Sequence, residues 1–175
     1  MRLFIAVEVP LEVKEFLYHI GVSLSHYKGI NKVNKENMHL TLLFLGERSD
    51  VKEIIGTLKK VRFKTIQLET DDFGFFPDKK RIRVIWLGLK HSDDLFYLQG
   101  EISNFFEEDR EFKPHITFAR VKFLKPDEKK ALLSEIGNLT KPYFKFKVDK
   151  FKLFSSELTS IGPIHRVVET FPAEK

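Results

Sequence analysis

Two apolar runs of strand length in this sequence begin with the same polar pair, a histidine and a threonine separated by one residue. The first run is HLTLLFLG at residues 39–46, and the second is HITFAR at residues 115–120. A segment with helical spacing of apolar residues follows each run, and then come the phenylalanine-rich stretches FKTIQLETDDFGFF and YFKFKVDKFKLFSS. This approximate repeat predicts two similar lobes related by a pseudo-two-fold axis.

The rest of the chain alternates strand-length apolar runs with segments of helical periodicity. We expect helices after Pro10, from about Ser49, around residues 95–106 and after Pro126, and strands near residues 3–9, 64–77, 81–89, 143–158 and 164–171. Between residues 143 and 158 the apolar positions change from even to odd at Asp149–Lys150, which predicts a bulge or a bend there. No linker or low-complexity tract divides the chain, so we expect a single domain.

Composition narrows the classes of function that the chain can have. With 42% hydrophobic residues among 175, it can bury a sizeable core. It contains no cysteine, which excludes a disulfide framework, a thiol nucleophile and iron–sulfur ligation. No apolar stretch reaches the roughly 18 residues of a membrane span, and no signal peptide is recognised, so we expect a cytoplasmic protein. The formal charge of +5 favours polyanionic partners such as RNA or nucleotides.

The first of the two runs has a polar and an apolar face. In a β-strand, residues i and i+2 point to the same side. His39 and Thr41 therefore share one face of their predicted strand. The other face carries Leu40, Leu42 and Phe44. We expect this second face to pack into a core.

The second run repeats the pattern. His115 and Thr117 share one face, while Ile116 and Phe118 lie on the other. If a dyad relates the two lobes, the two histidine–threonine faces can meet in one cleft. One reading is that each histidine belongs to a satisfied buried network with its threonine. The other reading is that the two pairs form a functional site.

The chemistry that suits such a site is metal-free cleavage of a phosphodiester. Two imidazoles with a pKa of about 6.5 can divide the roles of acid and base near neutral pH. Threonine hydroxyls can donate to phosphate oxygens, and a nearby arginine can neutralise the charge of a pentacovalent state. A metal site is the rival reading, but neither histidine has a second ligand at the usual spacing. Motifs of serine hydrolases, P-loop enzymes and dinucleotide-binding proteins are missing.

The two motifs, in this order and at this separation, resemble the paired signatures of the two-histidine (2H) phosphoesterase superfamily. The most similar group is the RNA 2′,3′-cyclic phosphodiesterases, also called 2′-5′ RNA ligases (LigT-like). MRLFIAVEVP, FFPDKKRIRVIWLGL and FKLFSSELTSIGPIHRVVETFP resemble the start, middle and end of that family. The resemblance implies an α+β fold over residues 1–175, in which two pseudo-symmetric antiparallel sheets line a central cleft and helices pack on the outside.

The resemblance also implies an activity, namely metal-independent hydrolysis of RNA 2′,3′-cyclic phosphate ends to 2′-phosphate ends. In that scheme His39 is the proton donor to the departing 3′ oxygen, and His115 accepts a proton from the attacking water. Thr41, Thr117 and Arg120 are the implied substrate-binding residues. The reverse reaction with a 5′-hydroxyl would give a 2′-5′ bond. We expect no metal, no cofactor and no membrane partner, and a monomer that acts on RNA ends, including those of tRNA fragments, or on nucleotides.

Several points stay open at the level of sequence. By strict alternation Arg120 lies on the face opposite His115, and it reaches the phosphate only if the strand bulges, ends or twists after Ala119. His165 lies in a predicted strand and could approach the cleft. Four cations near the Pro77 turn, namely Lys79, Lys80, Arg81 and Arg83, form a solvated face or contact an RNA backbone. A module that binds RNA ends or nucleotides without turnover is the alternative function.

Overall fold

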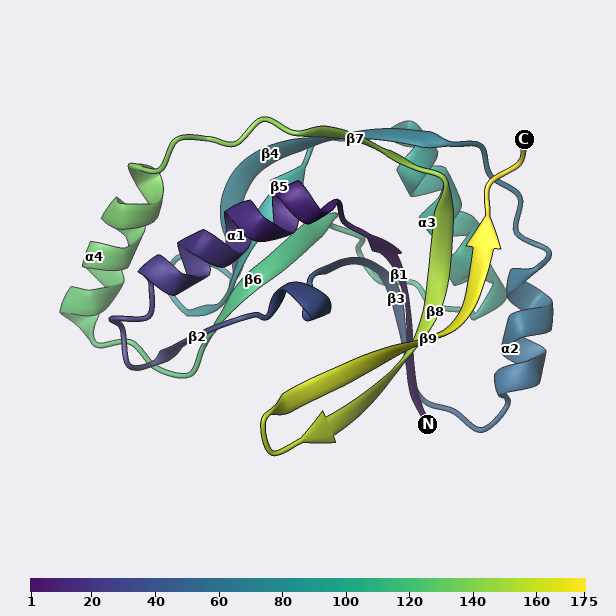
Figure 1. Cartoon of the computed structure of the whole chain (residues 1–175), viewed down its shortest axis with the longest axis horizontal. Coiled ribbons are helices and arrows are strands. Elements are labelled where there is room, and N and C mark those ends of the chain that lie inside the picture. The colour runs from purple at the N-terminus through teal and green to yellow at the C-terminus, as the bar shows by residue number, and fades with distance from the viewer.

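The computed structural model describes all 175 residues, and antiparallel strands make up its framework (Figure 1). The strands are β1 (Arg2–Glu8), β2 (Ile30–Lys32), β3 (His39–Glu47), β4 (Ile66–Pro77), β5 (Ile82–Leu89), β6 (His115–Val121), β7 (Lys145–Val148), β8 (Lys150–Thr159) and β9 (Gly162–Pro172). The helices are α1 (Leu11–Ser23), α2 (Val51–Leu58), α3 (Asp93–Phe105) and α4 (Pro126–Gly137), with a 3-10 turn, η1, at Lys35–Asn37. The expected helices and strands are present, whereas β2 and η1 were not predicted.

The strands follow the order β7-β4-β5-β6-β3-β1-β8-β9, and β2 pairs with β6 outside this path. Every adjacent pair is antiparallel. At the centre, β3 and β6 are joined by one backbone pair, Leu40 with Ile116. We call β3, β1, β8 and β9 the His39 half, and β6, β5, β4 and β7 the His115 half. The α+β class and the antiparallel architecture are therefore confirmed, and the two halves are joined edge to edge in one nine-stranded sheet.

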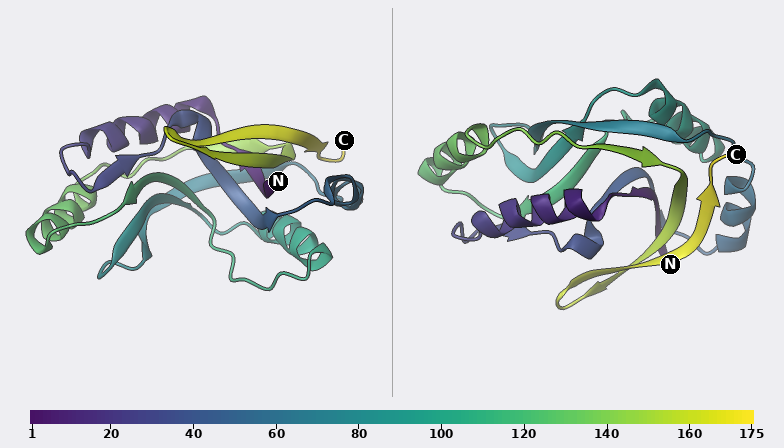
Figure 2. Two further views of the ribbon diagram at one scale, coloured as in Figure 1. Left: turned by 90° about the horizontal axis from the view of Figure 1, so that it is seen from below. Right: turned by 45° about the horizontal axis from the view of Figure 1, so that its top comes forward.

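Two helices cross from the half whose strand precedes them to the other half (Figure 2). Helix α1 follows β1 but packs on β2 and β6, where a Cβ atom added to Gly21 would lie 2.9 Å from the Cβ of Lys32. Helix α3 follows β5 but contacts β3, and its Gln99 Nε2 donates to the carbonyl of Leu42 at 3.4 Å. The two helices therefore connect the halves at the place where only one backbone pair joins β3 and β6.

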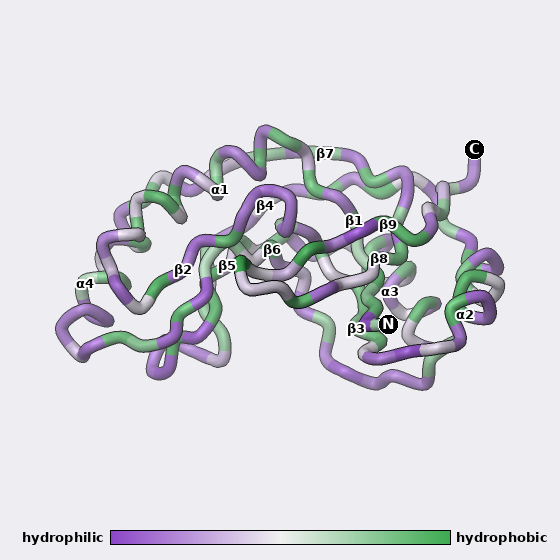
Figure 3. Tube along the Cα trace, turned by 60° about the horizontal axis from the view of Figure 1, so that its bottom comes forward, coloured by the Kyte–Doolittle hydropathy of each residue, from purple (hydrophilic) through white to green (hydrophobic).

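Most of the apolar side chains form one core of 38 buried residues. Hydropathy alternates along the helices, because each buries one side (Figure 3). Leu40 and Ile116 are fully buried in this core, so one face of the sheet is covered by the core where β3 meets β6. None of the helices combines the length and the apolar character that crossing a membrane requires.

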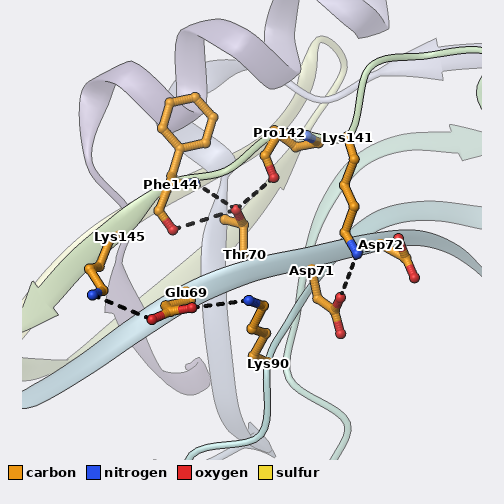
Figure 4. Close-up of polar contacts among 9 residues, drawn as sticks. All are labelled: Glu69, Thr70, Asp71, Asp72, Lys90, Lys141, Pro142, Phe144 and Lys145. Atoms are coloured by element: carbon orange, nitrogen blue, oxygen red, sulfur yellow. Dashed lines mark hydrogen bonds and ion pairs between the residues drawn. The ribbon is translucent and has the colours of Figure 1, made fainter.

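A buried threonine anchors the segment that returns from α4 to the sheet (Figure 4). Thr70 Oγ1 donates to the carbonyl of Pro142 at 3.1 Å and accepts from the Phe144 N–H at 2.9 Å. Ion pairs flank it: Lys141 with Asp71 and Asp72, and Glu69 with Lys90 and Lys145. The return segment is thereby held against β4 before the chain enters β7.

The predicted irregularity at Asp149–Lys150 is a change of partner strand. Strand β7 ends at Val148 and pairs with β4 in the His115 half. Strand β8 begins at Lys150 and pairs with β1 in the His39 half. The apolar phase changes there because the chain passes from one half of the sheet to the other.

Candidate active site

The joint between β3 and β6 brings the two polar pairs to one side of the sheet. Leu40 and Ile116 are direct partners, so their side chains share a face, and both are fully buried. Their neighbours at i−1 and i+1 must point the other way. Those neighbours are His39, Thr41, His115 and Thr117. The two histidine–threonine faces therefore meet, as the sequence predicted on the condition that a dyad relates the two lobes.

A β-bulge in β3 changes the direction of the residues after Thr41. Thr41 pairs with Ala6, but Leu43 pairs with Ile5, so Leu42 is an extra residue. Phe44 then pairs with Phe4 and packs against its ring, on the face of the sheet that carries His39. The Phe44 side chain is 61% exposed. The prediction that Phe44 faces the core with Leu40 and Leu42 is wrong, because the bulge reverses the alternation.

Strand β6 has a bulge at the matching position. Thr117 pairs with Trp86 and Ala119 pairs with Ile85, which leaves Phe118 as the extra residue. Arg120 then pairs with Val84, on the same face as the pair of Thr117 and Trp86. The strict alternation that placed Arg120 opposite His115 is therefore wrong, and the arginine lies on the His115 face.

His39 lies deep in the site, with 9% of its surface exposed. Its ring packs against Phe154 at 4.6 Å between centroids and against His165 at 5.4 Å. Burial lowers the pKa of His39 to about 4, and the charges of His165 and Lys14 act in the same direction. Glu8 and the Asn37 backbone oppose this shift without cancelling it. In the free protein this imidazole is neutral at pH 7.

His115 is held in one tautomer. Its Nδ1 lies 2.6 Å from the carbonyl oxygen of Lys113, and since a carbonyl only accepts, Nδ1 carries the proton. In the neutral ring, Nε2 is then left with a free lone pair. Phe76 packs edge-on against the ring at 4.7 Å, and Trp86 lies 5.9 Å away. Burial lowers the pKa of His115, and Arg120 and Lys113 add to this effect against the hydrogen bond to the Lys113 backbone.

Comparison with known proteins assigns a family to this pair of motifs. The model of the LigT-like phosphoesterases matches residues 7–86 and 88–165, and each segment contains one His-x-Thr. The chain belongs to the LigT-like phosphoesterase family.

Relatives and solved structures of this family match almost the whole chain. A Thermotoga maritima protein named RNA 2′,3′-cyclic phosphodiesterase is 40% identical, covering 96% of this chain and 93% of the relative. One of the same name from Methanocaldococcus jannaschii is 36% identical, covering 97% and 99%. A Thermus thermophilus crystal structure superposes with a TM-score of 0.78 at 28% identity over 98% and 97% of the two chains. Escherichia coli LigT in complex with 3′-AMP superposes with a TM-score of 0.78 at 25% identity over 99% and 98%.

In this LigT-like protein a third histidine joins the site. His165 on β9 lies 4.8 Å from the ring of Phe4 and 5.4 Å from that of His39, and its Nδ1 is buried without a partner. Burial lowers its pKa, and Arg120 adds to the effect. The sequence showed only that His165 lies in a strand, since its place depends on how β9 pairs with β8.

The basic cluster near Pro77 lies at the turn between β4 and β5. The Asp78 carboxylate accepts from the backbone N–H groups of Lys80 and Arg81, at 2.8 and 3.0 Å. Arg83 Nη1 donates to the carbonyl of Lys122, at the end of the strand that carries Arg120. Lys79, Lys80, Arg81 and Arg83 form no ion pairs.

The other three histidines pair with carboxylates elsewhere or are exposed. His26 pairs with Glu135 at 3.3 Å, and His91 pairs with Asp93 at 2.7 Å. His19 is an exposed residue of α1. No group of three or more histidine, aspartate or glutamate side chains is arranged to hold a metal ion.

Proposed function

We propose that this protein hydrolyses RNA 2′,3′-cyclic phosphate ends to 2′-phosphate ends with His39 and His115 as its acid and base. The observation that carries the proposal is the meeting of the two His-x-Thr faces at the joint between β3 and β6. Relatives that match nearly the whole chain are named for this activity. Since the site takes residues from both halves, residues 1–175 act as one domain, and one copy of the chain is sufficient.

His115 suits the role of the base. Its Nδ1–H is held by the Lys113 carbonyl, which leaves Nε2 free to accept a proton from the attacking water. The lowered pKa keeps this imidazole neutral at pH 7. The water oxygen bonds to phosphorus, the bond from phosphorus to the 3′ oxygen breaks, and the phosphate stays on the 2′ oxygen. His39 supplies the proton that the departing 3′ oxygen takes up.

The role of His39 requires a protonated imidazole, although its pKa is about 4 in the free protein. A phosphodiester bound beside it brings a negative charge into a buried site. Opposite charge favours the imidazolium, so the pKa of His39 rises when substrate binds. Protonation of the donor and binding of the anion are therefore coupled.

The other residues of the face complete the substrate site. The hydroxyls of Thr41 and Thr117 donate to the non-bridging oxygens, and Arg120 neutralises the charge that builds up at phosphorus. Phe44, exposed beside Phe4, offers a platform on which the terminal base stacks. In the reverse direction, a 5′-hydroxyl that replaces water would form a 2′-5′ bond.

The test is hydrolysis of an RNA oligonucleotide with a 2′,3′-cyclic phosphate end in the presence of excess chelator. We expect undiminished formation of the 2′-phosphate. Loss of activity that a divalent metal restores would refute the metal-free mechanism. Binding without product under single-turnover conditions would support the alternative of a non-catalytic RNA-end module.

A further inference from the structure

Glu8, the last residue of β1, lies directly opposite His39. The two are partners in the antiparallel ladder of β1 and β3. Side chains of direct partners share a face, and their Cβ atoms are about 4.5–5.5 Å apart. The carboxylate of Glu8 therefore extends along the same side of the sheet as the imidazole of His39.

A lysine from the next strand holds this carboxylate. Lys152 on β8 pairs with Ala6, and its Nζ lies 2.9 Å from Glu8 Oε1. The Lys152 side chain is only 15% exposed, so the ion pair is partly shielded from solvent. Burial acts to raise the pKa of Glu8, but the hydrogen bond and charge of Lys152, with smaller contributions from Lys14 and His39, hold that pKa below its ordinary value. Glu8 is therefore ionised at neutral pH and has a defined position.

Glu8 is the only carboxylate among the groups that act on His39. The others are Lys14 on α1, whose positive charge disfavours the imidazolium, and His165 on β9, which disfavours it when its own ring is protonated. Lys152 is paired with Glu8, and Arg120 acts on His115 and His165. The remaining influence, from the Asn37 backbone, is weaker than that of Glu8.

The matching position in the other half lacks this feature. The residue opposite His115 is Gly88, where an added Cβ would meet the Asp72 carbonyl oxygen at 3.1 Å. The charges that act on His115 are the cations Arg120 and Lys113. One imidazole thus has a carboxylate as its strand partner, and the other has only cations. This is the difference expected between a proton donor and a proton acceptor.

We propose that Glu8, held by Lys152, is a positioning residue that stabilises the imidazolium of His39 and makes this histidine the proton donor. The proposal rests on the proposed function, because it assigns a partner to the acid of that reaction. Glu8 does not touch the reacting atoms. It acts through His39.

The test compares the pH dependence of kcat for the wild type, Glu8→Gln, Glu8→Asp and Glu47→Gln. Removing the carboxylate lowers the pKa of His39. The alkaline limb of the pH dependence of kcat, which the proton donor sets, therefore moves to lower pH. We expect kcat of Glu8→Gln to fall about three- to tenfold on the alkaline side of the optimum, with KM within about twofold. Glu8→Asp keeps the charge and should recover most of the loss.

Glu47→Gln is the matched control, because Glu47 lies at the opposite end of the same strand pair, beside the N-terminal amino group. It should leave the profile unchanged. A uniform loss of kcat at every pH in Glu8→Gln would show a merely structural role and overturn the proposal. A profile of Glu8→Gln identical to that of the wild type would also overturn it.

A second measurement does not depend on turnover. NMR titration of the labelled imidazoles in the free protein should show His39 protonating at lower pH in Glu8→Gln than in the wild type, with His115 unchanged. Identical titration of His39 in both proteins would exclude the role of Glu8 even if the enzyme is active. Conversely, wild-type activity that survives His39→Ala would defeat the proposed function, whatever Glu8 does to the titration.

Discussion

The His39 half and the His115 half share a scaffold but differ in the groups around the histidine. In both, a strand begins with His-x-Thr and bulges at the residue after the threonine, Leu42 or Phe118. In both, an aromatic ring packs on the imidazole, Phe154 at 4.6 Å or Phe76 at 4.7 Å. The repeated scaffold sets the place of each imidazole. It does not set what that imidazole does.

The differences lie at two matching positions. Two residues after the bulge, the His39 half has Phe44 and the His115 half has Arg120. Opposite the histidine, the first half has Glu8 and the second has Gly88. The two imidazoles are placed symmetrically, but the charges around them differ. Such a difference is what allows one imidazole to act as an acid and the other as a base.

The largest effect should come from removing either imidazole. We expect His39→Ala and His115→Ala each to lower kcat by roughly 100-fold or more, since general acid and base steps contribute that much. The double variant should be little worse than either single variant, because the two act as a unit. Hydrolysis of the cyclic phosphate under saturating substrate measures this. Losses that multiply in the double variant would show that the two halves act independently.

The sequence was sufficient to predict the elements other than β2 and η1, and the shared scaffold, since these depend on local periodicity. It could not predict what depends on strand pairing. The directions of Phe44 and Arg120 follow from bulges that exist only because β1 and β5 pair as they do. The position of Glu8 opposite His39 is likewise a matter of register, and that of His165 depends on the partner of β9. At both bulges, strict alternation along the strand predicted the wrong face for the residues that follow, because the extra residue reverses the alternation.

The second prediction separates the two residues that follow the bulges. If Arg120 neutralises charge at phosphorus as proposed, Arg120→Ala should lower kcat by roughly 30- to 100-fold, because that stabilisation of the transition state is lost. It should also raise the pKa of His115, so the limb set by the base moves to higher pH. Phe44→Ala should mainly raise KM, because base stacking is made in the ground state as well. Equal effects of both changes on kcat and KM would contradict this division.

The third prediction concerns acid stability. The pKa of His39 is lowered to about 4 by burial and then by neighbouring charges, whereas the unfolded chain binds this proton near pH 6.5. His39 therefore causes no loss above pH 6.5, and stability falls as the pH decreases from there toward 4. Between pH 6.5 and 5 the loss should be about 1.5 kcal/mol. Urea unfolding of wild type and His39→Gln at both pH values checks this.

The variant without a titrating group at residue 39 should lose clearly less stability on acidification than the wild type. His115→Gln is the matched comparison from the other half. Because His115 is more exposed than His39, its removal should flatten the pH dependence less. If His39→Gln and the wild type lose the same free energy of unfolding, the deep burial of the donor does not govern acid stability.

The smallest effect should come from the two hairpin tips. The tip between β4 and β5 carries the unpaired cations Lys79 and Lys80, whereas that between β8 and β9 exposes Leu158 and Ile161, at 71% and 87%. Neutralising Lys79 and Lys80 to Gln should raise KM for an RNA oligonucleotide about three- to tenfold and weaken its salt dependence, since counterion release is lost. KM for a cyclic mononucleotide should not change, because that substrate has no backbone to reach the tip. Ile161→Ser on the other hairpin is the control for this measurement. If neutralising Lys79 and Lys80 raised KM for the mononucleotide as well, the two cations would act at the reacting phosphate and not on the RNA backbone.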